Sequence, residues 1–136
     1  MELKRRAEIP GYHAPGRERL AEMARFLESL PHGKLTFAQW YGHGRGCAVG
    51  LAARDPWFMA QGLGLEAPDS LKDCRPVFGG RCDWSAVTAF FAISEAEAKA
   101  LFTRNGYDGE VTPDPSRVAA KIRRHLSLAG TPALTA

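Results

Sequence analysis

The sequence has no long apolar run and few cysteines, and each of these absences excludes a class of protein. No stretch approaches the roughly 20 apolar residues of a membrane-spanning helix. Lys4, Arg5 and Arg6, near the N-terminus, are not followed by the apolar segment of a secretory signal. Three cysteines, an odd number, argue against a secreted scaffold held by disulfide bonds. We therefore expect a cytoplasmic protein that has no membrane partner.

The sequence also lacks a strong excess of charge of either sign, because 18 basic and 15 acidic residues give a net charge of +3. The hydrophobic fraction of 45% is ordinary for a globular protein. A chain of 136 residues can bury a core without a metal or a disulfide. We expect a single helical domain over residues 17–129, with a flexible arm at 1–16 and a frayed tail at 130–136.

Apolar residues recur at helical spacing in much of this domain, which predicts an all-α fold of about five to six short helices. The first helix, 17–30, places Leu20, Met23 and Leu27 on one face. Five helix-capping patterns mark where the later helices begin. The last of these helices is basic and runs to about residue 128. The five patterns are Thr36 with Gln39, Asp55-Pro56, Asp83, Ser94 with Glu97, and Asp114-Pro115.

Three segments before residue 83 have less regular patterns. The capping-box spacing of Thr36 and Gln39 predicts a short helix at 37–41, and a strand at 35–37 is the alternative. Small residues at 47–54 predict a closely packed helix. Residues 65–82 contain prolines and glycines without a clear period, so we expect a long loop with at most one helical turn.

Residues 84–92 are apolar nearly all round, which predicts the central and most buried helix. With the helix that follows, they form a helix-turn-helix-like hairpin over 84–103. A DNA-reading second helix would here begin with Glu95-Ala96-Glu97, and carboxylates repel phosphates. We therefore expect this hairpin to serve packing rather than DNA recognition.

The glycine-rich segment 42–50 contains two candidate sites. Its backbone amides and Arg45 could hold an anion. It lacks the features of a phosphate-binding or dinucleotide-binding loop, however, so a tight turn is the alternative. Cys47 lies at a predicted helix N-terminus, four residues after His43, and both features favour a reactive thiolate. Its small apolar neighbours indicate instead a buried cysteine.

Zinc has four candidate ligands, which are His43, Cys47, Cys74 and Cys82. Structural zinc sites usually draw on close pairs of ligands. Here His43 and Cys47 are four positions apart, and Cys74 and Cys82 are further apart than that. We therefore expect neither a metal nor a cofactor.

Two motifs carry a resemblance to other proteins. They are the segment Gly46-Cys47-Ala48-Val49-Gly50 and the hairpin turn Phe90-Phe91-Ala92-Ile93-Ser94. Through them, most of residues 17–126 resembles a group of small uncharacterised helical proteins of bacteria and phages, which have a Gly-Cys-x-x-Gly segment and a Phe-Phe-x-Ile/Leu-Ser hairpin. Many of those relatives carry two close cysteines in the first motif, whereas this chain has Cys47 alone. The resemblance implies no activity.

The pattern as a whole indicates a non-catalytic interaction module with a protein partner, such as a phage or mobile-element accessory or inhibitor protein. The partner would contact aromatic residues near Trp40, Trp57 and Phe58, the 65–82 loop, or the basic C-terminal helix. A nucleic-acid-binding protein that uses this helix and the N-terminal arm is one alternative. A thiol enzyme with Cys47 as the nucleophile is another. The basic side chains of the helix are Arg117, Lys121, Arg123 and Arg124.

Overall fold

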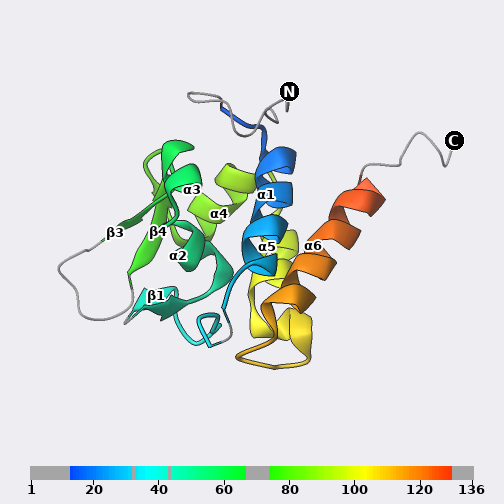
Figure 1. Cartoon of the computed structure of the whole chain (residues 1–136). Helices are drawn as coiled ribbons and strands as arrows, with labels where there is room; N and C mark the ends of the chain where they lie inside the picture. Colours follow the sequence, from blue (N-terminus) through cyan, green and yellow to red (C-terminus); the bar gives the residue numbers. More distant parts are fainter. Residues whose placement is uncertain (1–12, 32, 43, 67–73, 130–136) are drawn as a thin grey trace, which may run out of the picture.

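The computed structural model describes residues 13–31, 33–42, 44–66 and 74–129 (Figure 1). Within these residues it has six α-helices, one 3-10 helix and two small antiparallel sheets, so the expected all-α fold is wrong and the fold is mixed α/β. The elements, in chain order, are α1 (Gly16–Glu28), β1 (Tyr41–Gly42), β2 (Arg45–Gly46), α2 (Ala48–Ala52), α3 (Pro56–Ala60), β3 (Gly64–Glu66), β4 (Arg75–Phe78), β5 (Arg81–Cys82), α4 (Asp83–Phe91), α5 (Glu95–Phe102), η2 (Arg104–Tyr107) and α6 (Pro115–Ala129). Residues 1–12 of the expected arm and the expected tail at 130–136 lie outside the described residues.

The larger sheet, in the order β3-β4-β5, occupies much of the segment that we expected to be a long loop. Val77 of β4 pairs with Cys82 of β5 in an antiparallel register. Between these strands Gly79 and Gly80 have φ of +57° and +81°, and two successive left-handed residues are what a type I′ hairpin requires. The strands contain only two to four residues. Such short strands do not display an alternating pattern, so hydrophobic periodicity could not reveal them.

Residues 37–41 do not form the expected helix. Tyr41 lies in β1, and Leu35 makes a single bridge to β2. The Thr36 Oγ1 atom accepts a hydrogen bond from the Ala38 backbone N–H at 3.2 Å and thereby closes a turn. The Thr36 side chain was correctly expected to bond to a nearby backbone N–H, but the same bond occurs in turns as well as in helix caps.

Local hydrogen bonds confirm three of the five predicted helix starts. The carboxylates of Asp55 and Asp114 accept from the backbone N–H two residues later, at 3.0 and 2.9 Å. Ser94 and Glu97 make both bonds of a capping box, at 3.1 and 2.8 Å. Asp83 does not cap the helix as predicted, because it is the first residue of α4, with φ of +55°.

Helix α4 occupies the centre of the fold, as predicted for residues 84–92. Its residues Ala86, Val87, Phe90 and Phe91 are all buried, and the helix packs against α1, α5, β4 and β5. The predicted hairpin over 84–103 is confirmed as α4 and α5, which turn at Ala92 in a left-handed conformation with φ of +56°. The most extensive helix pair is α1 with α6, which lie side by side (Figure 1).

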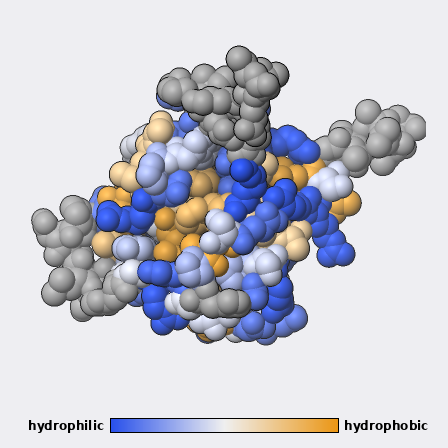
Figure 2. Space-filling model, viewed as in Figure 1, coloured by the Kyte–Doolittle hydropathy of each residue, from blue (hydrophilic) through white to orange (hydrophobic). Residues whose placement is uncertain are grey.

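On the face drawn in Figure 2, hydrophilic residues cover much of α1, and hydrophobic surface gathers nearer to α2. In the described part of the chain, no helix has both the length and the hydrophobicity that a membrane span requires.

The guanidinium of Arg19 joins the helices to the larger sheet. Its side chain is buried, and Nη1 donates to the Phe90 carbonyl at 3.0 Å. The group also lies 4.4 Å from the centroid of the Phe90 ring and 5.2 Å from that of Phe78. The Gln61 Oε1 atom accepts hydrogen bonds from Arg19 Nη2 at 3.4 Å and from the Ala14 backbone N–H at 2.7 Å. Residue 14 of the expected arm is thus buried and bonded to the segment after α3.

The glycines of the Gly-Cys-x-x-Gly segment are required by packing. A Cβ atom on Gly46 or Gly50 would overlap the Trp40 carbonyl oxygen, since the chain at Trp40 crosses directly over α2. The expectation of a closely packed helix of small residues is therefore confirmed by Ala48–Ala52, all of which is buried.

Gly50→Ala should lower the free energy of unfolding by about 1–3 kcal/mol, because the new methyl group must displace the Trp40 backbone. Urea unfolding measures this difference. Gly64→Ala is the matched control, since its Cβ would meet only the Val77 Cγ2 atom at 3.6 Å, an ordinary contact. Equal stabilities of the two variants would contradict the proposed crossing.

Candidate functional site

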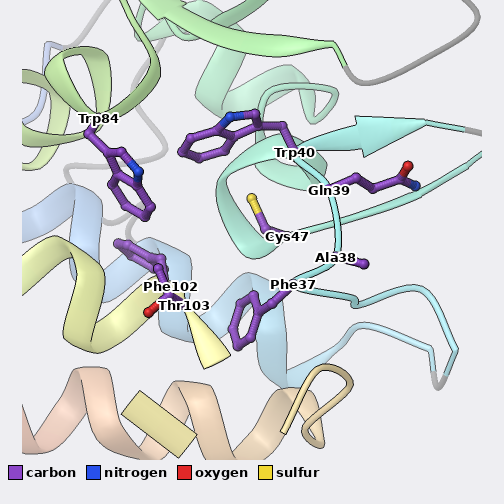
Figure 3. Close-up of a pocket in the computed structure, with 8 residues that line it drawn as sticks. All are labelled: Phe37, Ala38, Gln39, Trp40, Cys47, Trp84, Phe102 and Thr103. Atoms are coloured by element: carbon purple, nitrogen blue, oxygen red, sulfur yellow. The ribbon is translucent and has the colours of Figure 1, made fainter. Parts of the chain in front are cut away.

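A pocket of about 230 Å³ opens between the α4–α5 hairpin and the turn at residues 37–40 (Figure 3). We call it the aromatic pocket, because four of its side chains are aromatic rings. It is lined by Phe37, Ala38, Gln39, Trp40, Cys47, Trp84, Phe102 and Thr103.

Two tryptophans from distant parts of the chain meet at this pocket. The ring centroids of Trp40 and Trp84 are 4.9 Å apart with an interplanar angle of 58°, and both side chains are half-buried. The Cys47 backbone N–H donates to the Trp40 carbonyl at 3.0 Å and so holds the turn against α2. Phe37 is held in turn by a 2.7 Å hydrogen bond from its N–H to the Val111 carbonyl. The rings are therefore placed by backbone bonds rather than by flexible side chains alone.

Cys47 is the N-cap residue of α2, and its sulfur accepts the Gly50 N–H at 3.4 Å. Figure 3 shows the Sγ atom directed into the space that Trp40, Trp84 and Phe102 surround. The side chain is only 4% exposed. The predicted thiolate partner, His43, lies outside the described residues. The lining residues that the structure describes include no carboxylate, imidazole or amine that could take a proton from the thiol.

The other cysteines lie elsewhere. Cys74 bonds through its backbone N–H to the Tyr41 carbonyl at 2.9 Å, and Cys82 ends β5. Among the described residues, no group of three or more His, Cys, Asp or Glu side chains is arranged to hold a metal ion. His43 lies outside those residues, so the four-ligand zinc hypothesis, which sequence analysis disfavoured, is not tested as a whole.

The predicted aromatic contact surface is divided by the fold. Phe58 is 2% exposed and packs in the core between Phe26 and Phe90, at ring-centroid distances of 5.8 and 6.2 Å. Trp57 is half-buried and packs edge-on against Phe58 at 4.9 Å. Neither of them lines the aromatic pocket, whereas Trp40 does.

Most basic side chains of α6 contact the protein itself. Arg117 pairs with Glu110 at 2.7 Å, and Arg123 makes two 2.8 Å bonds to Glu28. These bonds lower the pKa of the Glu28 carboxyl and raise the pKa of both arginines. Exposed pairs of this kind contribute only about 0–1 kcal/mol each, so they show how the charges are arranged rather than what stabilises the fold.

Lys121 is held more firmly, because its ammonium donates to the Ala100 and Gly106 carbonyls at 2.8 and 2.7 Å. Its pKa is lowered by burial. Arg117, Lys121 and Arg124 line one shallow pocket beside Tyr107. The structure thus brings three of the four predicted basic residues together and turns Arg123 toward α1. Arg45, the predicted anion ligand, donates from Nε to the Gly33 carbonyl at 2.7 Å.

A second pocket adjoins the aromatic pocket, and we call it the polar pocket. It is lined by Phe37, Ala38, Thr103, Arg104, Asn105 and Val111, so the two pockets share Phe37, Ala38 and Thr103. Sequence analysis did not single out Thr103 or Arg104 as site residues. Both residues directly follow an amphipathic helix, and nothing in their local sequence indicates a site. They line a pocket because the distant residue Phe37 lies beside them.

Comparison with protein-family models, with curated proteins and with solved structures finds no match. The functional interpretation therefore rests on the geometry of the two pockets, and the resemblance to bacterial and phage proteins stays a prediction.

Native Cys47 should react with iodoacetamide much more slowly than Cys74 and Cys82, which are half-buried, because alkylation needs an accessible thiolate. Peptide mapping by mass spectrometry after timed labelling measures the three rates in one sample. In denaturant all three should react alike. Rapid labelling of native Cys47 would contradict its burial and favour the thiol-enzyme alternative.

The buried phenol of Tyr107 predicts how the stability of the fold changes at alkaline pH. Its hydroxyl donates to the Leu101 carbonyl at 2.8 Å, and burial raises the pKa of the phenol above its ordinary value near 10. The folded state therefore keeps this proton at a pH where the unfolded chain loses it. The resulting stabilisation is fully present below about pH 10 and is lost as the pH rises further.

Above about pH 10, the ionisation of this one group should lower the free energy of unfolding by about 1.4 kcal/mol for each pH unit. Tyr107→Phe lacks this hydrogen bond, so its free energy of unfolding at neutral pH should be about 1 kcal/mol lower than that of the wild-type protein. Its free energy of unfolding should also decline less steeply at alkaline pH. Urea unfolding across this pH range measures both. Parallel declines in the two proteins would contradict the assignment.

Proposed function

We propose that this protein is a small, non-catalytic interaction module that binds a protein partner through the aromatic pocket. The observation that carries the proposal is the pair of half-buried tryptophans, Trp40 and Trp84, at an open pocket. Tryptophan is enriched among the residues that dominate binding energy at protein interfaces, and such residues cluster around pockets.

The aromatic pocket by itself has the size of a single side chain, whereas the adjoining polar pocket measures about 500 Å³. Sites for small molecules and cofactors usually measure about 300–1,000 Å³, and the aromatic pocket measures about 230 Å³. One buried apolar side chain contributes about 1.5–3 kcal/mol, which is less than the entropic cost of association. The pocket therefore serves as the anchor point of a larger contact surface.

A role as a phage or mobile-element accessory or inhibitor protein is the finer form of this proposal, and it rests on the small size of the chain and the resemblance described above. The nucleic-acid alternative has less support, because Arg117, Lys121 and Arg123 have intramolecular partners. The thiol-enzyme alternative has less support, because the thiol is buried and the described lining residues include no base.

Trp84→Ala should remove most of the capture of a protein partner from a lysate of the natural host, by at least about tenfold, or 1.4 kcal/mol. Trp57→Ala is the matched control, since Trp57 is also half-buried in the first turn of a helix but lies outside the pocket. Quantitative mass spectrometry of the captured proteins measures the loss, and circular dichroism verifies that each variant is folded.

Ala38→Arg provides a second variant in case Trp84→Ala does not fold, because Ala38 is exposed and lines the pocket without contributing to the core. It should reduce capture as well. Loss of capture in Trp57→Ala alone would contradict the proposal in favour of the Trp57 surface. Loss of the wild-type capture after nuclease treatment would instead support the nucleic-acid alternative.

A further inference from the structure

The aromatic and polar pockets form one continuous surface. Phe37, Ala38 and Thr103 line both of them, and Ala38 is exposed and small. A chain segment that packs a side chain against Trp40 and Trp84 in the aromatic pocket can therefore continue past the small Ala38 into the polar pocket.

The charge at this surface is positive. Arg104, in the polar pocket, is exposed, and its guanidinium makes no hydrogen bond or ion pair with the residues that the structure describes. Most of the other described arginines bond to a carboxylate, a carbonyl or a hydroxyl; the side chains of Arg54 and Arg124 are the other two for which the described residues provide no such bond. The Lys99 ammonium, 5.9 Å from the Trp84 ring, is paired with Glu95 at 2.7 Å, so Arg104 carries the positive charge of this surface.

The backbone that carries Arg104 is fixed, although its side chain is not. The Arg104 carbonyl accepts from the Gly109 N–H at 2.9 Å, and the Thr103 carbonyl accepts from the Gly106 N–H at 3.1 Å. The Thr103 hydroxyl bonds back to the Lys99 carbonyl at 2.6 Å. The guanidinium is thus presented to solvent from a rigid 3-10 turn, and guanidinium binds carboxylates with two parallel hydrogen bonds.

We propose that the two pockets bind an extended peptide segment of the partner in which an aromatic or large aliphatic side chain is next to an acidic residue. The apolar side chain occupies the aromatic pocket, and the carboxylate binds Arg104 in the polar pocket. This inference rests on the proposed function and adds the chemistry of the partner. A segment with a basic residue in place of the acidic one is the rival occupant, and Arg104 disfavours it by repulsion.

The test begins with selection from a displayed library of random short peptides on the wild-type protein, with counter-selection on Trp84→Ala. The enriched peptides should combine Trp, Phe, Leu or Ile with a neighbouring Asp or Glu. The affinity of the best peptide, measured by fluorescence anisotropy, should fall by about tenfold or more in Arg104→Glu. A peptide with Lys in place of its acidic residue should regain affinity for that variant.

Arg124→Glu is the matched control, because it makes the same charge change at another exposed arginine whose side chain has no bond to the described residues and which lies outside both pockets. It should change the affinity by less than about twofold. Equal losses in the two charge variants would overturn the inference and indicate unspecific electrostatic attraction.

Enriched peptides without an acidic residue, or no enrichment at all, would also overturn it. If Trp84→Ala nevertheless loses the natural partner, the proposed function stands and only the acidic peptide chemistry fails. If peptides selected on the wild-type protein without the counter-selection bind Trp84→Ala equally well, the aromatic pocket is not the docking site and both proposals fail.

Discussion

The close approach of the Trp40 carbonyl to helix α2 is the constraint on which the site depends. This oxygen accepts the Cys47 N–H and lies where a side chain at Gly46 or Gly50 would otherwise be. Because the backbone is held there, the Trp40 ring reaches Trp84, and the Cys47 sulfur faces the space between them. The Gly-Cys-x-x-Gly segment is therefore a packing motif that also builds one wall of the aromatic pocket.

A second constraint holds the helices to the larger sheet. The buried guanidinium of Arg19 has carbonyl oxygens, an amide oxygen and aromatic faces as its partners among the described residues, and burial lowers its pKa. A buried charge with neutral partners contributes modestly to stability compared with the same volume of apolar packing. Its directional bonds to Phe90 and Gln61 instead specify how α1, α3 and α4 meet, and α4 in turn carries Trp84.

The two surfaces that sequence analysis put forward for binding, the aromatic residues of the 57–58 segment and the basic face of α6, are used largely for contacts within the protein. Phe58 completes the core, and the basic residues of α6 bond to Glu28, Glu110 and the carbonyls around η2. A surface that stays open to a partner is formed where the turn at 37–40 meets the α4–α5 hairpin. It combines aromatic rings with Arg104, whose guanidinium has no partner among the described residues, and this combination suits binding better than proton transfer.

The sequence by itself determined the features that depend on residues within one helical turn of each other. The caps at Asp55, Ser94 and Asp114 and the buried face of α4 follow from local hydrogen bonds and local periodicity. Tertiary structure alone decided the short strands, the burial of Phe58 and the meeting of Trp40 with Trp84. A strand of two residues is stable only when a distant segment supplies its hydrogen-bond partners. A pocket likewise exists only where chain segments far apart in sequence are held together, and the spacing of residues along the chain does not contain that information.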